Sequence, residues 1–380
     1  MKTEIQHGIY FENGRKFYCG GIPVVEVQGS WFQMGRQYGA LLRGELEKIH
    51  AFAKQAPDGM ARVGQLGRGS ISGLKRYDEL FRGMAETSGF SLEQLRIISS
   101  VEVIYLDCIT SDLRQTFNGG CCSSLAVWGD YTRTGEVLFG RNFDWLPEFE
   151  SILDTLALCV FHPSDGANSV AFLNWAGCPY MTTGMNERGL FLELNSGAFA
   201  DADIVAERIH NVWLLWEFLL NSDDAAALRR AFATCRASAA YIIGTADADK
   251  AEGFEWHTGG EYLSAQQEDG LMAAANHFTA PEWQNSPGAA LCGESSSFRR
   301  RENLLTLAKK YHDANEKIGP EEMMAVFEKT TADGGAKVCG TLFQVIAVPA
   351  EQKWYVKTKN MDDWAEIPLM NILKGNGELI

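Results

Sequence analysis

The spacing of apolar residues changes near residue 121, and this change constrains the fold more than any other feature of the chain. Before it, apolar residues recur at the spacing of one helix face. Ser30 is suited to cap a helix whose apolar face extends from Trp31 to Phe52, and Ser91-Leu-Glu-Gln94 has the spacing of a capping box. A single strand is expected earlier, at residues 24–27. The first third of the chain is therefore predicted to be mainly helical.

After Cys122 the pattern becomes that of strands bounded by turn residues. Strands are expected at 124–128, 137–140, 156–161, 169–174, 189–195, 239–245, 271–276, 341–348 and 354–357. Helices are expected at about 203–235 and 297–312, and again after Pro320, which suits a first helical position. Since no repeat or linker divides the chain, the sequence predicts an α+β fold in which sheets are covered by helices.

Composition and charge exclude several classes of partner. The 380 residues include 34 Lys and Arg against 49 Asp and Glu, a net charge of −15, which would repel nucleic acid and anionic membranes. The start of the chain has no secretory apolar block, and we expect a cytoplasmic protein. The nine cysteines include no C-x-x-C pair and the seven histidines no H-x-x-x-H pair, so we expect no metal site. We expect no other cofactor either.

The segment Asn118-Gly-Gly-Cys-Cys-Ser-Ser124 carries the clearest chemical signal. Its glycines lead to a thiol at the start of a strand, and Thr132-Arg-Thr-Gly135 supplies the turn of a hairpin. The returning strand would bring Arg141 and Asp144 beside Cys122. We expect Arg141 to lower the pKa of the thiol, and Asp144 to hold a neighbouring amine or thiol in register.

A cysteine nucleophile at this position needs a base. A free thiol has a pKa of about 8.5 and is only a few per cent thiolate at neutral pH, whereas an α-amine has a pKa of about 7.7–8.0. If the bond between Cys121 and Cys122 were cut, Cys122 would carry its own base. Its thiol is placed to make that cut by attacking the Cys121 carbonyl, with water releasing the acyl group. The sequence therefore predicts an N-terminal cysteine acting on amides.

Several further motifs follow in order along the chain. They are Phe139-Gly-Arg-Asn-Phe-Asp-Trp145, Gly184-Met-Asn-Glu-Arg-Gly-Leu190 with the strand that ends at Asn195, Ala275-Asn-His-Phe278, and Ser297-Phe-Arg-Arg300. Upstream stand Val25-Glu-Val-Gln-Gly-Ser-Trp-Phe-Gln-Met-Gly-Arg-Gln-Tyr-Gly39 and Glu79-Leu-Phe-Arg-Gly-Met-Ala-Glu86. With Cys122-Ser-Ser124, these motifs resemble the N-terminal-nucleophile (Ntn) hydrolases of linear amides. The acyl-coenzyme A:6-aminopenicillanic acid acyltransferase family is most similar, and choloylglycine (bile salt) hydrolases, penicillin V acylases and acid ceramidase are related.

The resemblance implies a four-layer αββα fold and a self-cleaving zymogen. Residues 1–121 would form a helical propeptide that stays associated, and residues 122–380 the catalytic part. The substrate would be a small N-acyl amide, with the acyl group passing to water or to an acceptor amine. No cofactor is implied.

The resemblance also implies a role for each matching residue. Cys122 would be the nucleophile, Arg141 would lie beside its thiolate, and Asp144 would orient the freed amine. Asn195 and Asn276 would line the oxyanion hole, and Arg300 would brace the site. Nearby aromatic residues would form an apolar acyl pocket, namely Trp128, Phe143, Trp145, Trp175 and Tyr180.

Simpler interpretations exist for each residue. Cys122 would be a buried structural thiol, Arg141 and Asp144 a salt bridge that closes the hairpin, Asn195 and Asn276 turn formers, and Arg300 a solvated helix charge. Other functions are a papain-like peptidase that pairs an internal thiol with His277, a redox protein with a disulfide between Cys121 and Cys122, and a binding protein on the same fold. The G-x-S-x-G sequence at 69–73 lacks the preceding strand of a nucleophile elbow, so we take it as a chance match.

Overall fold

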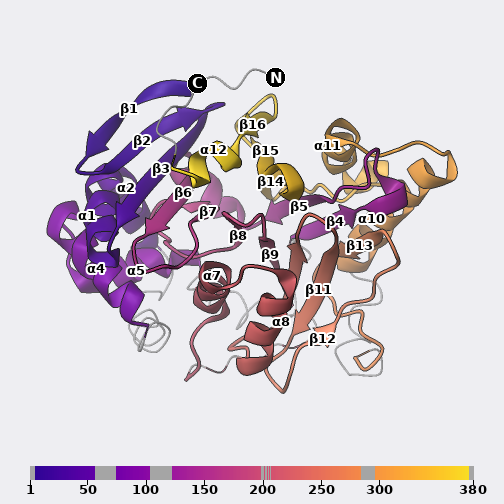
Figure 1. The fold of residues 1–380 in the computed structure, drawn as a ribbon, viewed down its shortest axis with the longest axis horizontal. Helices are drawn as coiled ribbons and strands as arrows, with labels where there is room; N and C mark the ends of the chain where they lie inside the picture. The colour runs from indigo at the N-terminus through magenta and orange to yellow at the C-terminus, as the bar shows by residue number, and fades with distance from the viewer. Residues whose placement is uncertain are drawn as a thin grey trace.

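The computed structural model describes residues 5–55, 74–102, 122–197, 207–283 and 296–375, together with residues 201, 203 and 205. Within these ranges the chain forms two sheets with helices packed against them, which is an α+β arrangement (Figure 1). No helix of the described ranges is both long enough and apolar enough to cross a membrane.

The larger sheet has ten strands and contains the start of the chain. In spatial order its strands are β1 (Ile5–Phe11), β2 (Gly14–Cys19), β3 (Ile22–Gly29), β6 (Leu156–Pro163), β7 (Val170–Trp175), β8 (Thr183–Asn186), β9 (Phe191–Ser196), β10 (Tyr241–Ala246), β11 (Ala251–Trp256) and β12 (Leu263–Ser264). Strands β3 and β6 are parallel, and the other described neighbours in this sheet are antiparallel.

The smaller sheet has six antiparallel strands, and Cys122 lies just before its strand β4. Its order is β13 (Leu271–Ala274), β4 (Ser123–Val127), β5 (Leu138–Asp144), β14 (Thr341–Val348), β15 (Lys353–Thr358) and β16 (Ala365–Ile367). The hairpin of β4 and β5 is thus central in this sheet, with β13 and β14 on its two sides.

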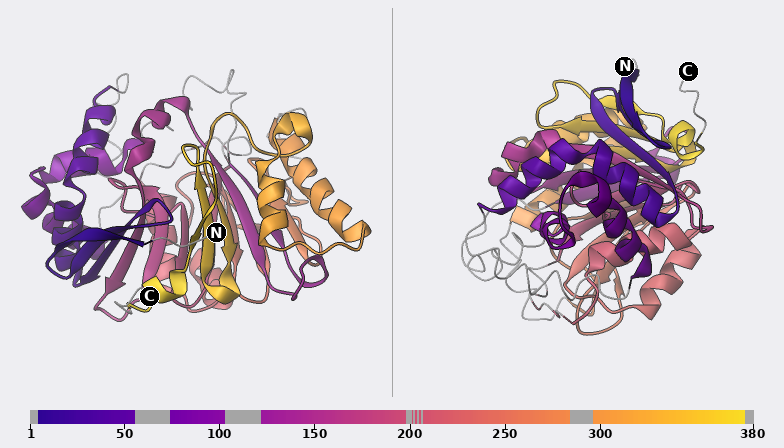
Figure 2. Two further views of the ribbon diagram at one scale, coloured as in Figure 1. Left: turned by 90° about the horizontal axis from the view of Figure 1, so that it is seen from above. Right: turned by 90° about the vertical axis from the view of Figure 1, so that its left-hand side faces the viewer.

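The helices divide between the two ends of the molecule. On the larger sheet, α1 (Trp31–Leu41) packs against β2 and β3, and α7 (Asn211–Asn221) packs against β8. Helix α4 (Lys75–Ser88) packs on α1, and α2 (Arg43–Ala53) and α5 (Leu92–Ser99) pack on each other. The smaller sheet packs against α10 (Ser296–Asp313) and α11 (Pro320–Glu328). The other two described α-helices are α8 (Ala225–Thr234), which contacts α7, and α12 (Leu369–Leu373), which contacts β6, β7 and β15. In the left view of Figure 2 both sheets stand between the N-terminal helices and the pair α10 and α11.

The apolar core lies between the two sheets and beneath their helices. Phe139 of β5 meets Phe191 of β9 with ring centroids 4.9 Å apart, and Phe191 meets Trp354 of β15 at 5.9 Å. On the other face of β5, a Cβ at Gly140 would lie 2.2 Å from the Phe327 ring of α11, so a glycine permits this close approach. The hairpin that carries the site is therefore held on both faces.

The N-terminal third differs from the sequence prediction in a way that matters for function. One strand was expected there, but β1, β2 and β3 are all present, and Val24 to Gly29 of β3 pair with Leu158 to Pro163 of β6. The residues before 121 are therefore part of the sheet formed by the residues after it. Their pairing was not visible in the sequence because β1 and β2 expose apolar side chains such as Tyr10, which is 72% exposed.

Two of the expected helices are each divided in two. The helix from Trp31 to Phe52 is interrupted at Leu42, whose backbone leaves the helical region (φ −113°, ψ 15°). The helix expected at 203–235 is α7 followed by α8, because Asp224 caps α8 by accepting a hydrogen bond from the Ala227 N–H. The helix cap at Ser30 and the capping box at Ser91 are present as predicted, and Ser30 also forms a capping box, with Gln33.

Candidate active site

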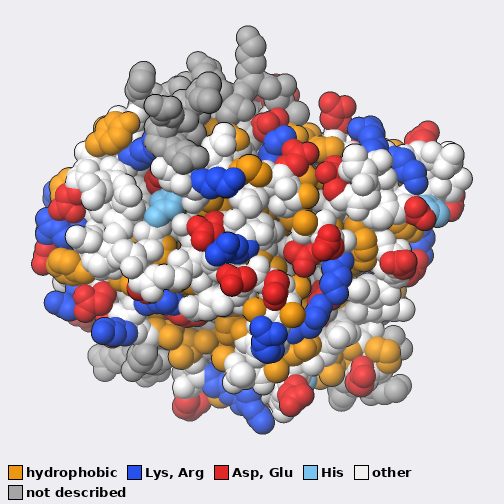
Figure 3. All heavy atoms as spheres, viewed as in Figure 1, with side chains coloured by type: hydrophobic (Ala, Val, Ile, Leu, Met, Phe, Trp, Pro, Cys, Tyr) orange, Lys and Arg blue, Asp and Glu red, His pale blue; other side chains and the backbone are white. Residues whose placement is uncertain are grey.

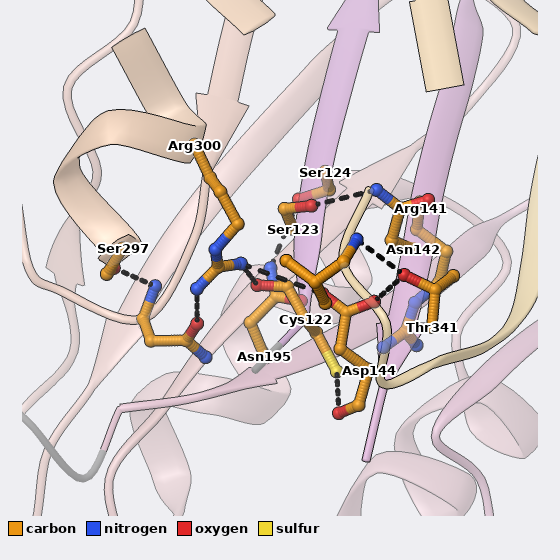
Figure 4. Close-up of polar contacts among 12 residues, drawn as sticks. Cys122, Ser123, Ser124, Arg141, Asn142, Asp144, Asn195, Ser297, Arg300 and Thr341 are labelled. Atoms are coloured by element: carbon orange, nitrogen blue, oxygen red, sulfur yellow. Dashed lines mark hydrogen bonds and ion pairs between the residues drawn. The ribbon is translucent and has the colours of Figure 1, made fainter. Parts of the chain in front are cut away.

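The hairpin of β4 and β5 brings the first set of candidate residues together. Ser123 pairs with Asn142 and Ser124 with Arg141, so Cys122 lies just before β4, beside the end of β5 where Asp144 is located (Figure 4). The Cys122 thiol lies 3.9 Å from the backbone oxygen of Asp144. This is the hairpin that the turn at residues 132–135 predicts.

Arg141 is fully buried and extends from the small sheet to the large one. Its Nη1 donates to the Thr182 backbone oxygen at 2.7 Å and to the Thr183 hydroxyl, and its Nη2 donates to the Leu194 backbone oxygen at 2.9 Å. Its Nε lies 3.7 Å from Oε2 of Glu193, which is also buried. The guanidinium of this smaller-sheet residue is therefore fixed by neighbours in and beside β8 and β9 of the larger sheet.

Asp144 is also buried and pairs with a different arginine. The Thr341 hydroxyl donates to its Oδ1 at 2.5 Å, and Nη1 of Arg300 lies 3.8 Å from its Oδ2. Burial raises the pKa of Asp144 to about 6, against the opposing effects of Arg300, Thr341 and Arg141. Since Arg141 and Asp144 form their ion pairs with other residues, the interpretation of the two as a salt bridge closing the hairpin is wrong.

Arg300 connects three parts of the site. It projects from α10, and its Nη1 donates to the backbone oxygen of Cys122 at 2.9 Å while its Nη2 donates to Oδ1 of Asn276 at 2.8 Å (Figure 4). Arg300 is 0% exposed, so it is not a solvated helix charge. Serine 297, one turn earlier on α10, accepts a hydrogen bond from the Asn276 backbone N–H at 2.8 Å.

The two candidate asparagines use their amide groups differently. Asn276 donates one hydrogen bond from Nδ2, to the Ser196 backbone oxygen at 2.8 Å, which leaves one amide hydrogen for another acceptor. Asn195 donates from Nδ2 to the Ser124 hydroxyl at 3.1 Å and to Oε1 of Glu193 at 3.2 Å, so both of its amide hydrogens have partners. Asn276 is thus the better placed of the two to receive a developing oxyanion.

Burial dominates the electrostatic environment of the thiol. It raises the pKa of Cys122 to about 11, and Asp144 and Glu193 raise it further, while Arg141 and the hydrogen bond to the Asp144 backbone lower it. Arg141 thus lowers the pKa of the thiol, as predicted, but desolvation outweighs its positive charge. In the intact chain this thiol needs a base to become a nucleophile.

A pocket opens on the thiol. The residues that line it are Glu102, Cys122, Phe143, Asp144, Trp145, Thr182, Leu194, Ser196, Val212 and Tyr241. Of the five aromatic residues expected to form an acyl pocket, Phe143 and Trp145 line it. The other three do not: Trp175 packs on Phe149 in the core, for example, with ring centroids 5.3 Å apart.

Two buried acids of this region, Glu102 and Glu193, were not predicted from the sequence. Glu193 precedes Asn195 by two positions in β9, and that spacing places both side chains on the same face of a strand that is otherwise apolar. A buried acid beside an expected site residue was the available signal. The signal for Glu102 was weaker: this residue is an acid in the mostly apolar stretch that follows Ile97.

His277 does not form a dyad with Cys122 in this structure. Its Nδ1 lies 2.8 Å from the Ser297 hydroxyl, its ring stacks on Phe298, and the hydrogen bond of the Cys122 thiol is made to Asp144. Burial lowers the pKa of His277 to about 4, and Arg301 and Arg300 lower it further. The ring is therefore a weak base at neutral pH.

Some predictions lie outside the described residues. These are the glycine approach at 118–120, Cys121 with the bond to Cys122, the disulfide between the two cysteines, and the sequence at 69–73.

Within the described ranges, no group of three or more His, Cys, Asp or Glu residues is arranged to hold a metal ion. On the face shown in Figure 3, Lys and Arg side chains are interspersed with Asp and Glu.

Comparison with known proteins gives distant structural likenesses. No family model and no curated protein matches the sequence. Among solved structures, a Caenorhabditis elegans ortholog of N-acylethanolamine-hydrolyzing acid amidase is 13% identical with a TM-score of 0.44, covering 60% of this chain and 93% of its own. A mutant conjugated bile acid hydrolase from Clostridium perfringens is 14% identical with a TM-score of 0.45, covering 68% and 93%. Penicillin V acylase from Agrobacterium tumefaciens is 14% identical with a TM-score of 0.41, covering 65% and 86%. Because these scores are low, a function is inferred below from the residues of the site alone.

Proposed function

We propose that this chain is a cysteine Ntn hydrolase that cleaves linear N-acyl amides through a thioester on Cys122. The observation that carries the proposal is the convergence on one residue: Arg300 holds the Cys122 carbonyl, the end of β5 flanks its thiol, and a pocket opens on it. The two sheets with helices at both ends fit the αββα sandwich of this proposal. Transfer of the acyl group to an amine is a second outcome of the same chemistry.

The base for this chemistry is the α-amine that cleavage before Cys122 would release. A buried thiol with a pKa of about 11 is almost entirely protonated at neutral pH, and His277 is not bonded to it. An α-amine titrates near pH 8 and would be attached to the nucleophile itself. In this proposal the amine takes the thiol proton as sulfur attacks the amide carbonyl, and the resulting ammonium protonates the leaving amine. Water then adds to the thioester and releases the carboxylic acid.

Asp144 and Arg141 have complementary roles in the proposed reaction. The Asp144 carboxylate, fixed by Thr341 and Arg300, would orient the amine and stabilise it when it is positive. The Arg141 guanidinium lowers the pKa of Cys122, although burial outweighs it, and would favour the thiolate during attack. Arg300 would brace the site through the Cys122 carbonyl and Asn276.

Asn276 would donate its remaining amide hydrogen to the oxyanion of the tetrahedral intermediate. One such donor contributes about 2.7–4 kcal/mol to the stability of a transition state in enzymes of this kind of chemistry. Asn195 would reach an oxyanion only by giving up its bond to Ser124 or to Glu193. Its role in the resting site is to hold those two residues.

The propeptide of this proposal, residues 1–121, would stay bound after cleavage. Six residues of β3 pair with β6, and Tyr38 of α1 donates a hydrogen bond of 2.6 Å to the Ala176 backbone oxygen. These contacts join the two parts over a large sheet. Cutting at 121–122 would thus create a new N-terminus without separating the fragments.

The test of the proposal is the intact mass of the purified protein combined with N-terminal sequencing. We expect two associated fragments, the second starting at Cys122, and a single uncut chain for Cys122→Ala. Incubation with an N-acyl amide should add the mass of the acyl group to the Cys122 fragment. Amidase activity retained by Cys122→Ala would refute the proposal, and a start at Cys121 would move the nucleophile by one residue.

The competing functions give different results in the same experiments. A papain-like peptidase would lose its activity in His277→Ala with the chain mass unchanged, whereas the Ntn proposal predicts that His277→Ala still forms the acyl adduct. A redox protein would lose two mass units on oxidation of Cys121 and Cys122 to a disulfide. A binding protein would show neither turnover nor an acyl adduct.

A further inference from the structure

The pocket that opens on Cys122 contains an acid that the proposed amide chemistry does not use. Glu102 comes from the N-terminal segment, is 8% exposed, and lines the pocket together with Cys122. The hydroxyl of Tyr180 donates to its Oε2 at 2.9 Å, and no other hydrogen bond joins this carboxyl group to the described residues. The remaining acceptor capacity of the carboxyl group is therefore available to a ligand.

A second polar group of the pocket has no hydrogen-bond partner among the described residues. The Thr182 hydroxyl is buried and makes no hydrogen bond to any described residue, although the residue itself is only 1% exposed. Its backbone oxygen accepts a 2.7 Å hydrogen bond from Arg141, which fixes the residue in place. Because a buried hydroxyl without a partner costs stability, its position in the pocket wall indicates a polar ligand group.

The rest of the lining suits a cation. Aromatic residues Phe143, Trp145 and Tyr241 form part of the wall, and aromatic faces attract ammonium groups. The other wall residues include the aliphatic Leu194 and Val212, which suit a hydrocarbon chain. A carboxylate, a hydroxyl and aromatic rings are together the groups that recognise an alkylammonium.

A positively charged ligand group would also change the ionisation of Glu102. Three carboxyl groups, Glu102, Asp144 and Glu193, accompany two guanidinium groups, Arg141 and Arg300. Burial raises the pKa of Glu102 to about 7, with Tyr180 and Arg141 opposing it, and burial raises the pKa of Glu193 to about 7 as well. A positive ligand group beside Glu102 would favour its ionised form and offset the cost of burying it.

We propose that Glu102 and Thr182 form an ammonium subsite, so that the preferred substrates are N-acyl amides whose acyl chain carries a positively charged amine. The inference rests on the proposed function of Cys122. The acyl chain is the part assigned to the pocket because it stays attached to the sulfur in the thioester, whereas the leaving amine has to depart before water attacks. Glu102 thereby makes the N-terminal segment a determinant of specificity.

The experiment compares substrates that differ only in an ammonium or a methyl group. The substrates are the p-nitroanilides of γ-aminobutyric and ε-aminocaproic acids, each paired with its methyl isostere, the valeryl or heptanoyl p-nitroanilide. We expect the protein to prefer the ammonium member of at least one pair by about tenfold or more in kcat/KM. Glu102→Gln should remove that preference, and Thr182→Val should reduce it, because kcat/KM should fall more for the ammonium substrates than for the methyl substrates.

Glu26→Gln is the matched control. Glu26 is also an acid of the N-terminal segment and also 8% exposed, but it pairs with Arg15 and His162 and does not line the pocket. Its substitution should leave the preference unchanged. Equal preference in the parent protein and in Glu102→Gln, or a parent preference for the methyl members, would overturn the inference. A Glu102-dependent preference for N-heptanoyl putrescine over its uncharged isostere would overturn the assignment to the acyl chain.

A binding measurement separates this inference from the proposed function. In the Cys122→Ala background, calorimetry should show tighter binding of ε-aminocaproate than of heptanoate, and Glu102→Gln should abolish the difference. Such binding without turnover of any amide by the parent protein would refute the proposed function but keep the subsite. Turnover without a difference in binding or in rate would refute the subsite alone.

Discussion

Two buried thiols, Cys122 and Cys159, have similar exposure but very different surroundings. Cys159 lies in β6 beneath α1, is 0% exposed, and contacts the Tyr38 hydroxyl at 3.3 Å. Burial raises the pKa of Cys159 to about 12, and the hydrogen bond with Tyr38 lowers it. Burial likewise raises the pKa of Cys122 to about 11, but Arg141, Asp144 and Glu193 act on that thiol as well.

The difference between them shows that neither burial nor a perturbed pKa identifies a nucleophile. Cys159 is surrounded by core side chains, whereas Cys122 lines a pocket and has a carbonyl held by Arg300. The candidate site therefore differs in two ways: the pocket gives a ligand access to the thiol, and charged groups are fixed around Cys122. Each prediction below tests one part of that distinction.

The largest expected effect is on the thiols themselves. Cys122→Ala should lower amidase kcat/KM by at least about a thousandfold, because the bond-forming atom is lost. Cys159→Ala should leave kcat/KM within about twofold and instead lower the free energy of unfolding by about 1 kcal/mol or more, because packing and a hydrogen bond are lost. Steady-state kinetics and urea unfolding on both variants measure these effects. Comparable activity loss in the two variants would remove the distinction.

The oxyanion donor should have the next largest effect. Asn276→Asp keeps an acceptor for Arg300 but replaces the amide donor by a carboxylate oxygen. We expect kcat to fall by about 10²- to 10³-fold with little change in KM, because the donor acts in the transition state.

Acylation rates of Cys122, measured by mass spectrometry, will show whether the loss in Asn276→Asp occurs in the chemical step. A suitable control is Ser164→Ala, in the loop after β6, which should keep the parent kcat. A kcat within threefold of the parent for Asn276→Asp would show that this amide does not stabilise the oxyanion.

The sequence predicted the hairpin of the site well, because its signals are local. The turn at 132–135 brings Cys122 and Asp144 together through a register that one hairpin determines. The partners from distant segments were harder. Arg300 was named only through a resemblance, and Glu102 not at all, since no local pattern says that α10 and Glu102 meet near Cys122.

The N-terminal strands illustrate the same limit on the scale of the fold. The parallel pairing of β3 with β6 joins residues more than 130 positions apart, for example Val24 with Leu158, and neither strand carries a local sign of its partner.

The pKa of Cys122 shows how far electrostatic effects can be predicted from the sequence. The sequence identifies Arg141 as a neighbour, but the desolvation that outweighs it depends on packing by both sheets.

The acids of the site should make stability depend on pH. Glu193 has an ordinary pKa of 4.5 and burial raises it to about 7, against the effects of Arg141, Ser124 and Gly244. The folded state thus keeps a proton that the unfolded chain releases, so this contribution to stability is complete below pH 4.5 and is lost as the pH rises through 7. Glu193→Gln should reduce the decline in the free energy of unfolding over this window by on the order of 3 kcal/mol.

Denaturant unfolding at a series of pH values tests this sign directly. Glu26→Gln provides the contrast, because His162 and Arg15 overcome the effect of burial and hold the pKa of Glu26 below 4.5. Glu26 therefore stabilises the protein above pH 4.5, and its contribution is lost as the pH falls. If both substitutions changed the slope in the same direction, the assignment of Glu193 as an acid that is protonated in the folded state would be wrong.

The smallest effect is expected at the hydroxyl beside Cys159. Tyr38→Phe removes a buried hydrogen bond to the Ala176 backbone oxygen and leaves that oxygen without this donor, so the free energy of unfolding should fall by about 1–2 kcal/mol. If the chain is cleaved as proposed, the two fragments should associate more weakly by a similar amount, because Tyr38 joins α1 to the chain after residue 122, and kcat should stay unchanged. Unfolding curves and size-exclusion chromatography of the cleaved protein measure both. A loss of kcat at constant stability would mean that the Cys159 region communicates with the site, and the two thiols would then belong to one functional unit.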